Sequence, residues 1–349
     1  MENKEYLKQL LLTPSPSGAE KDIIENVFNP YMKEFSTHEC TDKMGNSAFS
    51  ISDPSHSINK RVLISGHIDS IGLMVSHIKD SGILCISSNG GMDRRVLPGS
   101  LMDVILDDGR LITGIIGKKP IHVEEDSEYE KAIPLDKLTL DLGLSKEEVE
   151  NLGIYPGTLA VFHRGLENLE FGNGDLICSP DLDDKIGVYI TSEVMKRLGK
   201  GIPGTRVIGA AFTQEEVGLR GAKVMAKNLD PDISIDIDVI FETKDSELSE
   251  AKYGSVELGK GPVLEYGADK NRDLNKLIKK VAKDNNIDIQ LLATRPGGTN
   301  TNAIQLDCKN CMTTHIAIPL KNMHTQVEVV SWKDVNSCID LLVEVLKTL

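Results

Sequence analysis

Short apolar runs alternate with amphipathic segments along most of the chain. The runs at 61–66, 206–212, 233–241 and 315–320 are nearly continuous, the pattern of strands buried on both faces. Between two of them, Ile186, Ile190, Val194 and Leu198 recur at helical spacing. Strands that alternate with helices predict an α/β fold, with a doubly wound, mostly parallel sheet flanked by helices.

The segment from 71 to 164 has a different pattern. Its short β-branched stretches, such as 82–86 and 109–117, are punctuated by glycine, which is typical of a small β-barrel or sandwich. We therefore predict an inserted β-barrel domain at 71–164 and a discontinuous main domain formed by 1–70 and 165–349. The acidic stretch 124–130 inside the insertion is expected to be a solvated loop.

Local signals mark the start of two helices. Ser17 and Glu20 have the spacing of a capping box, and an apolar stripe at helical spacing follows them. Ser331 is expected to cap a C-terminal helix whose stripe includes Val335 and Leu342.

Composition argues against several classes of partner. The 349 residues include 39 basic and 53 acidic side chains, a formal net charge of -14, which disfavours binding to nucleic acid or to an anionic membrane. No apolar stretch approaches the roughly 20 residues of a membrane span, and residues 1–6 lack the features of a signal peptide. We predict a cytoplasmic protein.

The six cysteines are scattered, which fits a reducing compartment better than a disulfide scaffold. Cys308 and Cys311 form a C-x-x-C pair that could be redox-active or half of a zinc site. No second pair exists to complete such a site, so buried free thiols are the favoured interpretation.

Two adjacent carboxylates, Glu215 and Glu216, directly follow the apolar run at 206–212. Neighbouring carboxylates raise each other's pKa unless a cation lies beside them, so one could bind a metal while the other handles a proton. A solvated pair at the start of a helix is the structural alternative, because the helix dipole favours negative charge there.

Other potential metal ligands occur at equivalent places. His67 and Asp69 follow the first apolar run, Asp238 lies within the run at 233–241, His324 follows the last, and an acidic group at 181–184 precedes a helix. In open α/β sheets, functional groups collect beyond the carboxyl ends of the strands. Histidines with carboxylates suit zinc or cobalt.

Such a set exceeds the needs of one tetrahedral ion. Two ions about 3.5–4 Å apart would use it, with one bridging carboxylate and another free to take a proton from the attacking water. The sequence therefore predicts metal-assisted hydrolysis. Spacing alone leaves Asp181 and Asp184 as rivals of Asp183, and Asp236 as a rival of Asp238, because residues two apart in a strand share a face.

Four motifs together carry a family resemblance: 65–72 (SGHIDSIG), 182–185 (LDDK), 214–222 (QEEVGLRGA) and 318–328 (IPLKNMHTQVE). With 14–18, 95–99 and 117–122, they resemble the tetrahedral (TET) and glutamyl aminopeptidases of metallopeptidase family 42 over essentially the whole chain.

The resemblance implies a centre of two divalent ions, zinc, cobalt or manganese, in which Asp183 bridges the two. His67 and Asp238 would complete one ion, and Glu216 and His324 the other.

Two further residues receive roles from the resemblance. Glu215 would be the general base that takes a proton from the attacking water and passes it to the leaving amine. Asp69 would support catalysis by fixing the orientation of His67. His315 and His122 are not expected to bind metal.

The function implied is a metal-dependent aminopeptidase that acts on short peptides. It would form homo-oligomers, typically dodecamers built from dimers through the inserted domain. Alternatives are a hydrolase of acylated amino acids or blocked peptides, and a non-catalytic peptide-binding relative, against which the complete ligand set argues. Glycoside hydrolysis would use two carboxylates but would leave both histidines unexplained.

Three positions depart from the family pattern. Ser70 and Asn300 stand where acidic residues are usual, and Lys185 where arginine is usual. None is an expected ligand, so the predicted chemistry does not depend on them. The preferred N-terminal residue is not predicted.

Overall fold

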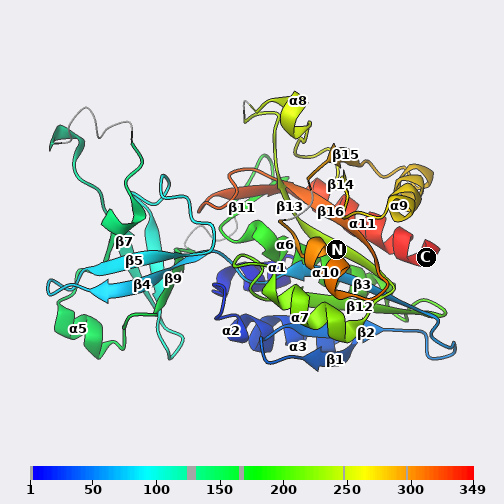
Figure 1. The fold of residues 1–349 in the computed structure, drawn as a ribbon, viewed down its shortest axis with the longest axis horizontal. Coiled ribbons are helices and arrows are strands. Elements are labelled where there is room, and N and C mark those ends of the chain that lie inside the picture. The colour runs from blue at the N-terminus through cyan, green and yellow to red at the C-terminus, as the bar shows by residue number, and fades with distance from the viewer. Residues whose placement is uncertain (1–2, 124–130, 165–168, 247, 296–297) are drawn as a thin grey trace.

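The computed structural model describes residues 3–123, 131–164, 169–246, 248–295 and 298–349. Its largest element is an eight-stranded sheet in the order β1-β2-β12-β3-β13-β16-β14-β15, whose four central strands β12, β3, β13 and β16 are parallel (Figure 1). Helices flank this sheet, which confirms the predicted α/β class. The sheet strands are β1 (Thr37–Thr41), β2 (Ser47–Ile51), β3 (Lys60–His67), β12 (Thr205–Phe212), β13 (Ile233–Phe241), β14 (Val263–Tyr266), β15 (Gln290–Ala293) and β16 (Met312–Leu320).

The helices vary from single turns to 17 residues. They are α1 (Lys4–Leu12), α2 (Lys21–Ile23), η1 (Ile24–Phe28), α3 (Asn29–Lys33), η2 (Ile121–Val123), η3 (Leu135–Lys137), α5 (Lys146–Asn151), α6 (Leu182–Leu198), α7 (Arg220–Leu229), α8 (Glu250–Tyr253), α9 (Arg272–Asp284), α10 (Asn300–Asp307) and α11 (Trp332–Thr348). Within the described ranges, none is both long and apolar enough to cross a bilayer.

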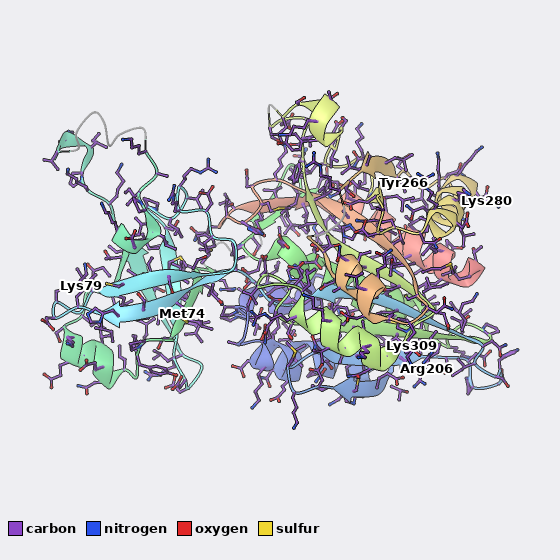
Figure 2. All side chains as sticks on the ribbon, in the orientation of Figure 1. Met74, Lys79, Arg206, Tyr266, Lys280 and Lys309 are labelled. Atoms are coloured by element: carbon purple, nitrogen blue, oxygen red, sulfur yellow. The ribbon has the colours of Figure 1, made fainter. Side chains whose placement is uncertain are left out.

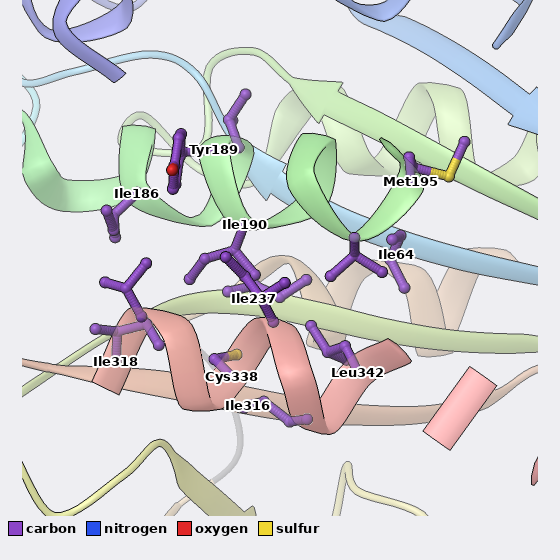
Figure 3. Packing of buried hydrophobic residues seen from close by; sticks show 14 of the residues in the cluster. Ile64, Ile186, Tyr189, Ile190, Met195, Ile237, Ile316, Ile318, Cys338 and Leu342 are labelled. Carbon is purple, nitrogen blue, oxygen red and sulfur yellow. The ribbon is translucent and has the colours of Figure 1, made fainter. Parts of the chain in front are cut away.

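Successive side chains of the central strands point to opposite faces of the sheet, so they contribute to two hydrophobic cores, one on each face. Val62 and Ile64 of β3 belong to the core beneath α1, α6 and α11, whereas Leu63 belongs to the core beneath α7 and α10. Figure 3 shows Ile190 of α6 and Leu342 of α11 against the strands on the first side. Because helices bury both faces, apolar residues point to both sides of these strands, as the sequence pattern indicated, although β13 also buries Asp236 and Asp238.

The insertion is a closed six-stranded barrel in the order β4-β5-β8-β7-β6-β9, set to one side of the main sheet (Figure 1). It has its own core, which includes Leu73, Val104 and Leu140. The barrel predicted from the glycine-punctuated pattern is confirmed; the boundaries at 71 and 164 and the role in dimerisation stay predictions. The strands are β4 (Gly72–Ile78), β5 (Leu84–Asn89), β6 (Leu101–Ile105), β7 (Leu111–Ile116), β8 (Thr139–Asp141) and β9 (Leu159–Phe162).

A small antiparallel sheet, β10 (Leu169–Phe171), β11 (Leu176–Ser179) and β17 (Glu328–Ser331), lies beside the start of α11. Ser331 caps α11 as predicted, since its side chain accepts the N–H of Lys333. The acidic stretch 124–130 lies outside the described residues.

The predicted capping box at Ser17 and Glu20 is wrong. Glu20 accepts the N–H of Gly18, while the Ser17 hydroxyl donates to Asp69 Oδ2 at 2.7 Å. The Ser17 hydroxyl, which the local pattern predicted to cap a helix, therefore bonds instead to Asp69, 52 residues away.

Candidate metal centre

The carboxyl ends of four neighbouring strands bring the predicted side chains together. His67 is the last residue of β3, and Phe212, its partner in β12, lies just before Glu215 and Glu216. Asp238 lies in the next strand, β13, and His324 follows β16. Parallel strands end at the same side of the sheet, so residues far apart in sequence meet there.

One cluster contains His67, Asp183 and Asp238, all buried. His67 Nε2 lies 3.1 Å from Asp183 Oδ1 and 3.9 Å from Asp238 Oδ1. One nitrogen and two carboxylate oxygens within this spacing are a suitable partial ligand set for a divalent transition-metal ion.

A second cluster contains Asp183, Glu216 and His324. His324 Nε2 lies 3.3 Å from Asp183 Oδ2 and 3.4 Å from Glu216 Oε1. Asp183 thus presents one oxygen to each cluster, which is the arrangement required of a bridging carboxylate.

The charges of these groups depend on one another. Although burial opposes ionisation, the two histidines hold the pKa of Asp183 well below its usual range. Hydrogen bonding to Asp183 and Glu216 raises the pKa of His324 to about 11. Burial raises the pKa of Asp238 well above its usual range, with further repulsion from Asp183.

Glu215 lies beside both clusters without belonging to either. Its Oε2 is 4.0 Å from His67 Nε2, and the residue is 8% exposed. Burial raises the pKa of this carboxyl to about 9, and Asp238 and Glu216 add repulsion that His67 only partly opposes. The neighbouring Glu216 is within the second cluster, so the two adjacent carboxylates have different surroundings.

Asp69 holds the loop that carries this pair. Its carboxylate accepts the N–H groups of Glu215 and Glu216 at 2.9 and 3.2 Å and the Ser17 hydroxyl at 2.7 Å. Its backbone oxygen lies 3.0 Å from His67 Nδ1. Asp69 therefore orients His67 through its backbone and the glutamate loop through its side chain.

Asp69→Asn is expected to destabilise the protein. An amide replaces one acceptor oxygen with a donor, so at least one buried N–H or O–H loses its partner, at a cost of about 1–3 kcal/mol. Urea unfolding of both proteins measures the change. Ser17→Ala, which removes a single donor, should cost less; an equal or larger loss there would contradict the assignment.

Two further buried carboxylates support the clusters, although neither had an assigned role from the sequence. Glu328 accepts the backbone N–H of Asp183 at 3.1 Å and that of His324 at 2.7 Å. Asp184 accepts the backbone N–H of His67 at 3.1 Å. Only the presence of Glu328 in a family motif could have drawn attention to it, because its partners lie on separate segments.

The rival aspartates have other partners. Asp181 forms ion pairs with Arg164 and Lys185, and Asp236 accepts the Ser65 hydroxyl at 2.7 Å. Asp184 points to backbone N–H groups of His67 and Gly187. The two clusters described above therefore form around Asp183 and Asp238.

The other histidines differ from each other in their surroundings. His315 is buried in β16, with Nδ1 3.0 Å from Glu265 Oε2, and can group with Asp236 and Asp238. It is therefore close to one of the candidate ligands, Asp238, although it was not expected to bind metal. His122 is exposed in η2. Neither belongs to the clusters that contain Asp183.

The C-x-x-C cysteines are free, as expected, but both are only partly buried. They pack against the core formed with α7 and α10, on the face of the sheet opposite α6 and α11. There, Cys308 Sγ donates to the carbonyl of Ala226.

A cavity of about 650 Å³ opens over both clusters. Beyond the candidate ligands it is lined by apolar and aromatic side chains such as Phe241, Tyr253 and Leu292, and by the charged residues Lys252, Glu265 and Arg295. Such a volume suits a small ligand. The three departures from the family pattern, Ser70, Lys185 and Asn300, are buried, and none lines this cavity.

The family model of the M42 glutamyl aminopeptidases matches residues 47–341. The chain belongs to this family. As an M42 protein it falls among the peptide hydrolases, and the predicted membership is confirmed.

Relatives and solved structures agree with the M42 assignment. The lysyl aminopeptidase of Pyrococcus furiosus is 31% identical and aligns over 99% of this chain and 97% of its own length. A TET aminopeptidase from a marine sediment thaumarchaeon has a TM-score of 0.92 at 30% identity, covering 99% of this chain and 96% of that one. The TET1 peptidase of Pyrococcus horikoshii, which can assemble into a tetrahedron or a large octahedral shell, has a TM-score of 0.83 at 31% identity, with 99% of both chains covered.

The donor set of the M42 chain suits divalent cations. Asp183, Glu215, Glu216 and Asp238 place four carboxyl groups around two imidazoles in a largely buried site. Buried carboxylates without counter-charge take up protons instead of ionising, as the raised pKa of Glu215 and Asp238 indicates. Cations bound between these oxygens would supply the missing positive charge.

Proposed function

We propose that the chain is a metal-dependent aminopeptidase that removes N-terminal residues from short peptides. The observation that supports this most is the pair of clusters sharing Asp183, one completed by His67 and Asp238 and the other by Glu216 and His324. Divalent ions held by these residues would polarise the scissile carbonyl and make water a stronger nucleophile.

Glu215 is the proposed general base. It lies next to both clusters and to the cavity, but it is free of the short contacts that Glu216 makes with His324. Once cations favour its ionised form, its carboxylate takes a proton from the attacking water and returns it to the leaving amine. The Asp69 carboxylate, which accepts the backbone N–H of Glu215, fixes the position of Glu215 during both transfers.

The cavity favours a free amino terminus. A free α-amine would be held near the bound ions or a carboxylate of the cavity, and an acylated amine would lose that interaction. The apolar wall formed by residues such as Phe241 and Leu292 can receive the first side chain.

We also propose a cytoplasmic homo-oligomer, a dodecamer built from dimers that pair through the barrel. The TET1 relative forms closed shells. On this chain's barrel, Met74, Leu101, Leu111 and Ile115 are 37–53% exposed, and Figure 2 shows Met74 on β4. Exposed apolar residues gathered on one small domain favour an interface.

Chelation and substrate choice test the proposed activity. Leucyl, glutamyl, lysyl and N-acylated p-nitroanilides are assayed before and after EDTA treatment and after adding back zinc, cobalt or manganese. We expect hydrolysis of a free-amine substrate that disappears on chelation and returns with metal. Preference for the acylated substrates would support the blocked-peptide alternative; activity unaffected by chelation would contradict the proposal.

A further inference from the structure

The inserted barrel contacts one of the candidate metal ligands directly. Gly91, which lies just beyond β5, presents its carbonyl oxygen to His324 Nδ1 at 2.9 Å. The two residues are 233 positions apart, and the contact joins the barrel to the loop after β16.

This contact determines which ring nitrogen carries hydrogen. A backbone carbonyl can only accept, so His324 must donate from Nδ1. In the neutral ring, the lone pair is then on Nε2, the nitrogen that lies 3.3 Å from Asp183 and 3.4 Å from Glu216.

The fit around Gly91 is close. A Cβ atom added there would lie 3.0 Å from both Cε1 and Nδ1 of His324. The backbone of His324 is also held, because Glu328 accepts the His324 N–H at 2.7 Å. The histidine therefore has little freedom to move away from Gly91.

The segment that carries Gly91 is itself anchored. Asn89 donates from Nδ2 to the Ser17 carbonyl at 2.9 Å, and the Ser17 hydroxyl donates to Asp69. The Gly91 carbonyl is thus held in place against the main domain, independently of His324.

We propose that Gly91 is a positioning residue, through which the barrel selects the metal-binding tautomer of His324. The inference rests on the proposed metal-dependent function. His67 has an equivalent acceptor in the Asp69 carbonyl, at 3.0 Å, but that acceptor belongs to the main domain. One of the two ions therefore depends on the barrel, and the other does not.

Gly91→Ala tests this dependence, with Gly117→Ala as the matched control. Gly117 is also a glycine of the insertion without a left-handed backbone, and no atom lies within 4 Å of an added Cβ. Zinc binding to each metal-stripped protein is measured by calorimetry. We expect Gly91→Ala to keep one site at its original affinity and to weaken the other by about 10–100-fold, the usual effect of losing a hydrogen-bond partner of a metal-bound histidine.

The outcomes separate the inference from the function on which it rests. If the unsubstituted protein binds two ions and Gly91→Ala binds both with unchanged affinity, the inference is wrong while the proposed function stands. If the unsubstituted protein binds no ion, the proposed function is wrong as well. Gly117→Ala should match the unsubstituted protein; an equal loss there would show a general effect of altering the barrel and would overturn the inference.

A measurement on the unsubstituted protein avoids the risk that Gly91→Ala misfolds. In the zinc-loaded protein labelled with ¹⁵N-histidine, the signals absent from His324→Gln identify His324. We expect a protonated Nδ1 and a zinc-bound Nε2. The opposite tautomer would overturn the inference.

Discussion

Glu215→Gln is expected to lower kcat by about 10²–10⁴-fold, the usual contribution of a general base, while two ions remain bound. Glutamine has nearly the same shape and keeps a polar side chain beside His67, but it cannot accept a proton. The residue makes no contact as short as those of Glu216 with His324, so its loss should leave the ligand set intact.

The experiment combines steady-state kinetics with metal analysis of the same preparations. Glu216→Gln is the informative comparison, because it changes the adjacent residue in the same way but removes a candidate ligand. It should lose metal as well as activity. Glu344→Gln, which changes a partly exposed glutamate that pairs with Lys347 on α11, should alter neither metal content nor activity. If Glu215→Gln retained full activity, the general-base role would be wrong.

Asp183→Asn is expected to reduce the bound metal from two ions to fewer than one. Asp183 is the only residue common to the two described clusters, with one oxygen directed to each histidine. An asparagine offers one neutral oxygen, so it cannot bridge two cations or balance their charge. Partners of metal ligands alone are worth about 10–100-fold in affinity or activity, so the loss of the bridge should exceed about 100-fold in activity.

Metal analysis after gel filtration, together with the hydrolysis assay, measures the effect. Asp340→Asn is the control, because Asp340 is exposed and pairs with Arg197 at the surface, away from both clusters. Retention of two tightly bound ions in Asp183→Asn would exclude the bridging role. Loss of one ion with normal affinity for the other would show that Asp183 serves a single site.

The fold was predictable because its physical signals are local. Strands buried under helices on both faces carry apolar residues on both sides, as the run around Val62 does. The candidate ligands were predictable for a related reason, since parallel strands end at one side of the sheet and family motifs follow those ends.

The spacing of residues in the sequence could not decide which aspartate is the candidate metal ligand, because that depends on the local backbone geometry. Asp183 and Asp184 are neighbours at the start of α6, yet both have non-helical backbone angles, and only Asp183 faces the histidines. Asp184 instead accepts the N–H of His67. The periodicity of a helix or a strand cannot predict which way these two side chains point, because the backbone at Asp183 and Asp184 is not helical.

Contacts between distant segments were out of reach for the same analysis. Ser17 looked like a helix cap because its own neighbours were the only partners a local pattern could consider, whereas its partner is Asp69. The approach of Gly91 to His324 joins two domains and leaves no trace in either segment's own pattern.

The outermost strands of the main sheet limit how copies of this chain can associate. β1 has five residues and an irregular register between His38 and Cys40, and β15 has four residues. Short or bulged edge strands resist the backbone pairing that leads to aggregation, and a closed barrel has no free edge. Self-assembly should therefore proceed through side-chain surfaces instead of through extension of a β-sheet, so that association of copies of this chain does not lead to a fibre.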